Sequence, residues 1–356
     1  TAKVTPWAEV GDDYKTAYTN RYGEAAAEPI GVTVTGASVI PGGTWIVSDG
    51  KRLPGYVLKV RAVSPHFGTI TIDPAVPESG IYSPDAQVTV TFAPVEGVTF
   101  FGWEGASESK ELSVTVTMDE NKSIYADFGA SFWVYEDGTL TDGKWILAAS
   151  GAADAITVGK PLENRSDGWL DLAKPVKGGT VIGIEPGVSM DFSKTTLRRV
   201  SFPETLQVLG QQTFDCCRSI TNITPFLPRS ITTINLSAIY GNSALAGDLE
   251  IGCGVDAEGK PIAITLGQRL FANSPKIGPT VRLGRGVSAL ALNTFVGCTG
   301  IRNLVFEGDM PTINRGAFNC AADQMRIYTP YAGGKSWAKT NWGAYFANPL
   351  CVTPWK

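Results

Sequence analysis

This sequence has few of the residues on which most enzyme chemistry depends. It contains one histidine, His66, and charged residues make up only 18% of its 356 residues. A histidine-rich metal site is therefore excluded, and a Ser-His-Asp or Cys-His catalytic arrangement would have to use His66. Because His66 lies between Pro65 and Phe67 with no nucleophile motif nearby, a structural role is favoured. We expect a protein that is not an enzyme and that requires no cofactor.

The chain also lacks an excess of positive charge and any long apolar run. Its formal net charge is −4 at pH 7, so it offers no positive field to attract nucleic acid or anionic lipid. No stretch approaches the roughly 18 consecutive apolar residues that indicate a membrane helix. The sequence begins at Thr1 without a signal-peptide pattern, so we expect a signal and an anchor to lie outside this segment. We expect neither nucleic-acid binding nor membrane insertion.

Cysteine is absent from the N-terminal half of the chain. The six cysteines are Cys216, Cys217, Cys253, Cys298, Cys320 and Cys351. None is part of a CxxC spacing, which excludes the common zinc patterns. Their even number is compatible with disulfides in an oxidising compartment, although a chain of this length does not need them. Both states stay open, and the repeat described below favours buried thiols.

Pairs of carboxylates are the remaining candidates for catalysis. Glycoside hydrolysis needs two acids about 5–10 Å apart, and a sequence does not reveal that separation. The adjacent pairs Asp12-Asp13 and Asp119-Glu120 follow no calcium-loop spacing. Solvated turns are the favoured interpretation of both pairs.

The chain is rich in the residues of strands and tight turns. Hydrophobic residues make up 43% of it, and 40 glycines and 22 prolines separate many Val-Thr and Ile-Thr runs. The composition predicts a mainly β protein, and the length predicts two or three domains. We divide the chain into an N-terminal β region (1–65), a β module (66–129), a bridge or N-terminal cap (130–196) and a solenoid with a C-terminal cap (197–356).

The β module is predicted from five strand-like runs separated by turn residues. The runs cover residues 68–72, 87–92, 99–103, 112–118 and 123–128. The motifs Gly80-Ile81-Tyr82, Gly97-Val98-Thr99-Phe100-Phe101-Gly102-Trp103, Val116-Thr117-Met118-Asp119 and Ala126-Asp127-Phe128 occur in a characteristic order. This stretch resembles the divergent internalin B-type repeat of bacterial surface proteins, with Pro84-Asp85 in place of the usual glycine after the tyrosine. The resemblance implies a spacer or adhesive β module without catalytic residues.

A repeat in the C-terminal part predicts a solenoid. Large apolar residues recur at spacings of 25, 32, 24 and 23 residues, at Phe214, Ile239, Phe271, Phe295 and Phe318. We call these five the frame residues. A second apolar position lies five residues before each frame residue, and a third lies eight residues before it, where the third repeat has Ala263. A strand-like segment follows each of the first four frame residues. Such a frame suits a solenoid, because each repeat can bury its apolar side only against its neighbours. The long interval contains the polar segment 256–260, which should loop out.

The amino-acid sequence of the repeats carries a second resemblance. The run Leu197-Arg198-Arg199-Val200-Ser201-Phe202-Pro203-Glu204-Thr205-Leu206 and the segment Gly316-Ala317-Phe318-Asn319-Cys320 resemble the BspA-like leucine-rich repeat of bacterial surface antigens. The resemblance covers about residues 180–356. Cys217 and Cys298 occupy the same repeat position, which favours packing over reactivity.

The resemblance also implies a terminal strand and a capping helix over residues 335–346. Ala338, Trp342, Tyr345 and Phe346 would share the apolar face of this helix. Trp337, Trp342 and Tyr345 could alternatively form a sugar-stacking platform, although packing is the favoured role of such aromatic residues. Of the three, Trp337 is expected to lie off the packed face.

Strand alternation predicts one candidate binding surface. If Val200, Leu249, Leu283 and Leu304 point inward, the outward side chains are Arg199, Thr224, Glu250, Arg282, Val305 and Tyr328. These residues and Trp337 are the candidate ligand contacts, and a merely solvated face is an equally open interpretation. We expect an extracellular or cell-surface bacterial protein, adhesin-like, that binds a host or neighbouring-cell protein or glycan. The alternatives are a non-catalytic carbohydrate-binding or spacer region of a secreted enzyme, and a structural stalk.

Overall fold

The computed structural model describes residues 55–165, 167–191, 196–309, 311–314, 316–318 and 325–330, and the backbone of four further strands within 38–54 and 351–354. The chain divides into two compact units, Thr1–Gly129 and Ala130–Lys356. The described residues contain strands and turns but no helix, which confirms the mainly β prediction. The predicted capping helix over 335–346, with Trp337, lies outside the described residues, as does the Asp12-Asp13 pair.

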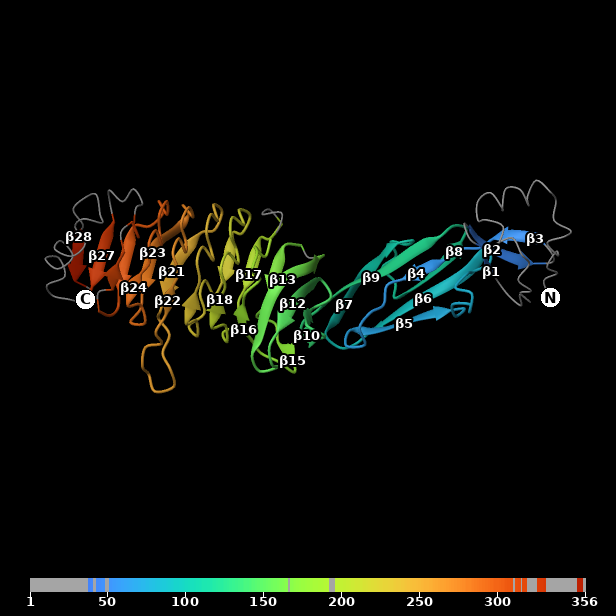
Figure 1. Cartoon of the computed structure of the whole chain (residues 1–356), viewed down its shortest axis with the longest axis horizontal. Coiled ribbons are helices and arrows are strands. Elements are labelled where there is room, and N and C mark those ends of the chain that lie inside the picture. The colour runs from blue at the N-terminus through green and yellow to red at the C-terminus, as the bar shows by residue number, and fades with distance from the viewer. Residues whose placement is uncertain are drawn as a thin grey trace, which may run out of the picture. The chain divides into compact units, whose positions relative to one another are not determined.

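The described part of the first unit contains three small sheets (Figure 1). The first sheet contains β1 (Ser38–Ile40), β2 (Gly43–Ser48) and β3 (Lys51–Pro54), all antiparallel. The second contains β4 (Leu58–Val60), β9 (Lys122–Ala130) and β7 (Val98–Gly105). The third contains β5 (Gly68–Asp73), β6 (Ala86–Pro94) and β8 (Ser113–Met118). Strands therefore occupy all five segments predicted for the β module.

Alternation along β6 builds the core of this unit. Val88, Val90 and Phe92 are fully buried, and the residues between them are at least partly exposed, as expected for a sheet with one buried face. The ring of Phe128 on β9 packs 5.5 Å from that of Phe92. The two sheets thus share one aromatic core.

The second unit begins antiparallel and becomes parallel. Its nine-stranded sheet has the order β15 (Val176–Lys177), β10 (Trp133–Glu136), β11 (Thr139–Thr141), β12 (Trp145–Ser150), β13 (Ile156–Asn164), β16 (Val181–Ile184), β18 (Val208–Leu209), β20 (Thr233–Ile234) and β22 (Thr265–Leu266). Every pairing from β13 onward is parallel. Parallel neighbours one repeat apart are the arrangement that a solenoid requires.

Two further parallel sheets, together with a strand pair, complete the repeats. One sheet contains β14 (Trp169–Asp171), β17 (Arg199–Ser201) and β19 (Asn222–Thr224). The other contains β21 (Gly247–Ile251), β23 (Ile277–Leu283), β25 (Asn303–Phe306), β27 (Arg326–Thr329) and β28 (Cys351–Pro354). The pair is β24 (Ala289–Leu290) and β26 (Thr312–Ile313). The sheet that ends at β19 is therefore not continuous with the sheet that begins at β21.

The aromatic frame predicted from the sequence forms the centre of the solenoid. All five frame residues are buried, and the rings of Phe271, Phe295 and Phe318 stack with centroids 5.4 and 5.2 Å apart. The residue two positions before each frame residue has a positive φ, namely Gln212, Ser237, Arg269, Asn293 and Gly316. Repetition of this unusual backbone state shows that each repeat turns in the same way around its frame residue.

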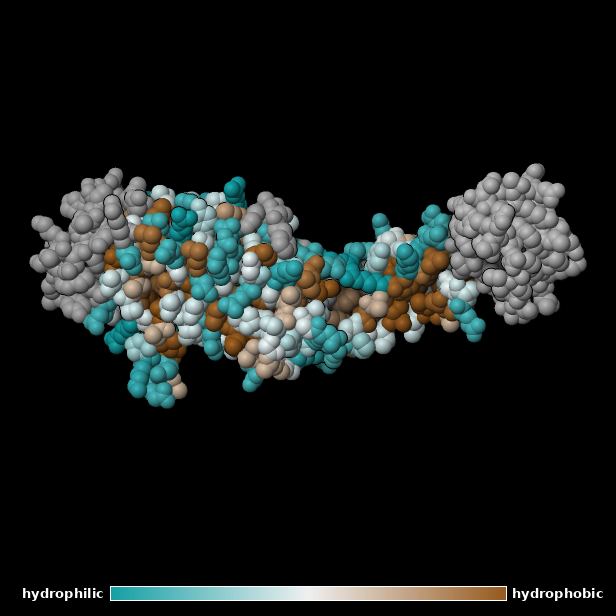
Figure 2. Space-filling view, in the orientation of Figure 1, coloured by the Kyte–Doolittle hydropathy of each residue, from teal (hydrophilic) through white to brown (hydrophobic). Residues whose placement is uncertain are grey.

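One position of the predicted frame is wrong. Ala263 is exposed, and Ile264 is the buried residue that bridges to Val287 of the next repeat. The chain enters β22 extended, so Ile264 and Leu266 point to the same side and Ala263 to the other. The preceding segment 256–260 does loop out, in a turn closed by the Asp256 carboxylate, and Figure 2 shows a largely hydrophilic projection there.

Two buried tryptophans close the N-terminal end of the solenoid. Trp133 on β10 and Trp145 on β12 are 0% and 1% exposed. Their indole Nε1 groups donate to the main-chain carbonyls of Asp171 and Trp169 on β14, at 2.7 and 2.9 Å. Beside them, Lys174 Nζ lies 2.6 Å from Oδ2 of the buried Asp142. The antiparallel strands β10 and β12 therefore cover the first repeat, and their indoles donate hydrogen bonds to main-chain carbonyls on the outer edge of β14.

Candidate ligand-binding face

The predicted outward residues lie on two sheets. Glu250, Arg282, Val305 and Tyr328 form one row across β21, β23, β25 and β27, each in register with the next. Arg199 and Thr224 lie on the three-stranded sheet and in different rows. Arg199 is in register with Trp169 and Asn222, whereas Thr224 is in register with Ser201 and Asp171. The predicted outward residues therefore lie on two separate sheets and in three rows.

Val305 does not offer the exposed surface that alternation predicted. Only 7% of it is exposed, although it faces away from Leu304 along the strand. Its neighbours in register are Arg282 and Tyr328, whose side chains are both longer than that of Val305. Alternation therefore predicted the direction of this side chain but not its burial.

The row on the five-stranded sheet is internally neutralised. Arg282 lies 3.5 Å from a Glu250 carboxylate oxygen and 2.9 Å from one of Glu307, and Arg229 also approaches Glu250 at 3.7 Å. Each guanidinium here has a carboxylate partner within the protein. Such partly exposed pairs contribute little to stability, and they leave little uncompensated charge for a ligand.

The three-stranded sheet presents a different arrangement. The Arg199 guanidinium lies 4.5 Å from the ring centre of Trp169, and the indole Nε1 of Trp169 donates to Ser201 Oγ at 3.1 Å. Trp169 remains 38% exposed, while the tryptophans beside it are buried. These contacts hold a large aromatic surface and a cation in fixed positions on one outward face. We call Trp169, Arg199, Ser201, Asn222 and Thr224 the aromatic patch.

Trp169 was missed by the sequence reasoning. Strand β14 lies before the first recognised repeat, and only its parallel pairing with β17 brings Trp169 beside Arg199. A strand-like run with a tryptophan one repeat length before Arg199 was the available signal.

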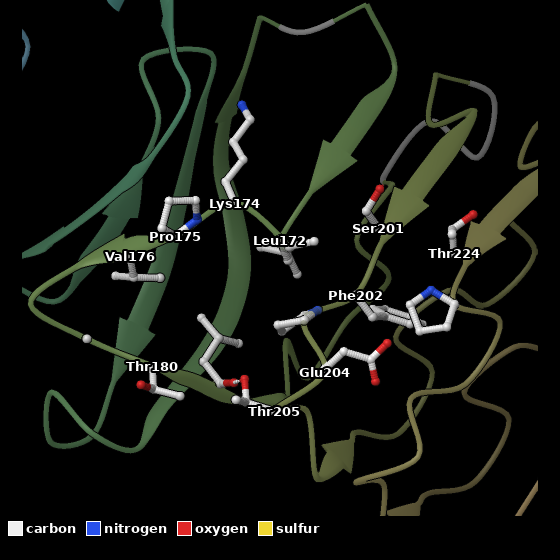
Figure 3. Close-up of a pocket in the computed structure, with 15 residues that line it drawn as sticks. Leu172, Lys174, Pro175, Val176, Thr180, Ser201, Phe202, Glu204, Thr205 and Thr224 are labelled. Carbon is white, nitrogen blue, oxygen red and sulfur yellow. Dashed lines mark hydrogen bonds between the residues drawn. The ribbon is translucent and has the colours of Figure 1, made fainter. Parts of the chain in front are cut away.

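A cavity of about 580 Å³ adjoins the patch and shares Ser201 and Thr224 with it. Its other lining residues include Leu172, Val176, Phe202 and the prolines Pro175, Pro203 and Pro225. Figure 3 shows Ser201 and Thr224 on neighbouring strands and the Lys174 amine pointing away from the other lining side chains. This volume lies within the range of pockets that hold small-molecule ligands.

The described residues considered for catalysis differ in burial. His66 is exposed in its turn, and Asp119 is exposed and paired with Lys122 at 2.6 Å, which lowers the pKa of Asp119. Cys217 and Cys298 are buried, as predicted, and Cys298 Sγ donates to the carbonyl of Phe271 at 3.0 Å. Within the described ranges, no cluster of three or more His, Cys, Asp or Glu residues could hold a metal ion.

Comparison with known families assigns both parts of the chain. Residues 58–131 match the model of the divergent InlB B-repeat domain, and residues 188–251 and 261–330 match six copies of the BspA type leucine-rich repeat region. The chain carries BspA-type leucine-rich repeats. Both resemblances inferred from the sequence are thereby confirmed.

Three solved structures resemble the chain only distantly. The pneumococcal vaccine antigen PcpA is 16% identical with a TM-score of 0.42, over 63% of this chain and 48% of its own. The T. pallidum leucine-rich-repeat protein is 19% identical with a TM-score of 0.35, over 51% and 89%. A leucine-rich cell-surface protein from Faecalibacterium prausnitzii is 14% identical with a TM-score of 0.18, over 62% and 96%. The chain spans about half the length of PcpA, and no curated protein matches it.

The aromatic patch lies near the N-terminal end of the BspA-type repeats. The matched region begins at residue 188, so β17 and β19 lie within it and β14 just before it. No helix in the described part of the chain is long and apolar enough to cross a membrane.

Proposed function

We propose that this chain is part of a secreted or cell-surface bacterial protein whose BspA-type repeats bind an extracellular macromolecule of a host or neighbouring cell. The support is the repeat family together with the divergent InlB B-repeat, which we propose acts as the presenting module. Binding of this kind needs no cofactor and no chemical step, because a rigid repeat surface supplies preorganised contacts.

The observation that carries the proposal is the exposure of Trp169 on the aromatic patch. Trp133 and Trp145 are buried, whereas Trp169 is 38% exposed, contacts Arg199 and Ser201, and lies beside a cavity. Tryptophan and arginine are the residues that most often dominate binding energy in protein interfaces. A patch that combines them is the strongest candidate contact surface among the described residues.

Binding of the whole chain to immobilised mucin, extracellular-matrix proteins and bacterial cell surfaces tests this proposal. Biolayer interferometry should detect at least one partner, and Trp169→Ala should weaken that binding at least tenfold, since a central hot spot contributes more than about 1.4 kcal/mol. Leu292→Ala is the matched control, because Leu292 is 40% exposed on a distant repeat. Absence of any partner, or equal binding by both variants, would overturn the proposal and favour a purely structural stalk.

A further inference from the structure

The side chains of the aromatic patch indicate the chemistry of the ligand that it would bind. The inference drawn from them rests on the proposed function above. Two arginines were predicted to face outward, and their surroundings differ. Arg282 is held between the carboxylates of Glu250 and Glu307. Arg199 is exposed, stacks on Trp169, and has no carboxylate within ion-pair distance among the residues that the structure describes. The patch therefore presents a positioned guanidinium that lacks a negative partner.

The neighbouring strand extends this arrangement with hydrogen-bonding groups. Asn222 is exposed and in register with Arg199, and its Oδ1 accepts a 2.6 Å hydrogen bond from Thr224 Oγ1. That bond orients the amide, and its Nδ2 has no partner within the described ranges. Neighbouring strands lie about 4.8 Å apart, so Trp169, Arg199 and Asn222 form a row about 10 Å long. The row offers, in order, an apolar ring, a planar cation and an amide donor.

The β14 edge of this sheet is closed to an added peptide strand. A peptide that joins a sheet edge binds through main-chain hydrogen bonds to the edge strand. On β14, the carbonyls of Trp169 and Asp171 already accept hydrogen bonds from the buried indoles of Trp145 and Trp133. Recognition beside Trp169 therefore relies on side chains rather than on strand pairing. The row supplies a ring, a guanidinium and an amide, while carboxylates lie nearby at Asp171, in register with Ser201, and at Glu204, in the cavity lining.

We infer that Trp169, Arg199 and Asn222 form a subsite for a carboxylate-bearing sugar unit of an extracellular glycan. The Arg199 guanidinium binds the carboxylate through two parallel N–H donors, a geometry that its planar fork matches. The exposed part of the Trp169 ring packs against the C–H face of the sugar. The Asn222 amide donates to a ring hydroxyl, and the adjoining cavity accepts a substituent.

The test uses carboxylated oligosaccharides, each compared with its methyl ester. Oligogalacturonate, a hyaluronan tetrasaccharide and sialyllactose are titrated into the whole chain by isothermal calorimetry, with a poly-glutamate peptide as a non-sugar anion. At least one saccharide should bind, and its methyl ester should bind at least tenfold more weakly. Arg199→Gln should cause a similar loss, and Arg199→Lys a partial one, because lysine keeps the charge without the planar fork.

Arg282→Gln is the matched control, because Arg282 is an outward arginine outside the patch, and its binding should equal that of the unaltered chain. Equal binding of a saccharide and its ester, equal binding of poly-glutamate, or no saccharide binding would each overturn the inference. If mucin or cell-surface binding persists and depends on Trp169 while no carboxylated saccharide binds, the inference fails and the proposed function stands. Failure of both assays removes both.

Discussion

The indole Nε1 of Trp133 donates a 2.7 Å hydrogen bond to the main-chain carbonyl of Asp171, thirty-eight residues away in the sequence. Together with the matching bond from Trp145 to the carbonyl of Trp169, it satisfies main-chain acceptors on the outer edge of β14, the first strand of the three-stranded sheet. Unpaired strand edges invite pairing with other chains. The antiparallel strands thus protect the end of the solenoid and hold the strand that carries Trp169.

Removing one of these donors should destabilise the second unit. Trp133→Phe keeps most of the buried ring but leaves the Asp171 carbonyl without its partner, so we expect a loss of about 1–3 kcal/mol. Urea unfolding of the whole chain, followed by near-UV circular dichroism, measures this. Trp169→Phe is the control: its indole is partly exposed and bonds to a side chain, so its loss should be smaller. Equal midpoints for the two variants would contradict the role given to Trp133.

Asp142 should be the most sensitive charged position beside the tryptophans. Its carboxylate accepts bonds from the backbone N–H groups of Lys144 and Trp145 and from Lys174 Nζ. Asp142→Ala leaves all three donors unsatisfied, and we expect a loss of about 3–5 kcal/mol. Asp142→Asn retains an oxygen for the two backbone donors and should lose clearly less. Denaturant titration of both variants checks the order, which the reverse ranking would refute.

The stack of aromatic frame residues predicts coupling between neighbouring repeats. Phe295→Ala removes the ring that contacts both Phe271 and Phe318 and should cost about 3–5 kcal/mol. Because each repeat packs only on its neighbours, amide hydrogen exchange should accelerate most in the repeats of these two residues. Phe295→Leu fills part of the space and should show a smaller effect. Uniform acceleration across β10 to β13 as well would argue against nearest-neighbour coupling.

Cys253 should be a poor nucleophile at neutral pH. Burial, followed by the negative charges of Glu307 and Glu250, raises the pKa of its thiol to about 11. A raised pKa favours the neutral thiol, and the thiolate is the reactive form, so alkylation should be slow at pH 7 and rise about tenfold per pH unit until about pH 11. Iodoacetamide labelling read by mass spectrometry measures this. In urea the same residue should level off near its ordinary pKa of about 8.5, and a native plateau at that value would disprove the shift.

Several features could be predicted because they repeat along the chain. The frame residues from Phe214 to Phe318 recur at nearly constant spacing, and burial of one requires burial of the next. The exceptions are local. The buried residue at the third apolar position of the third repeat is Ile264 and not the predicted Ala263. The looped-out segment 256–260 changes how the chain enters its strand, and a fixed spacing does not predict such a one-residue shift.

The sequence by itself determined the mainly β class and the apolar frame of the solenoid, because hydrophobic periodicity can be read directly along the chain. The two repeat families were inferred from motifs that resemble them, and the family models match the same regions. Only the tertiary structure decided which outward residues matter. Pairing between strands that are distant in the sequence gave Arg282 two carboxylate partners and brought Trp169 beside Arg199, and Val305 is buried in the same fold. Those contacts depend on neighbours from distant positions, and the spacing within any single strand does not contain them.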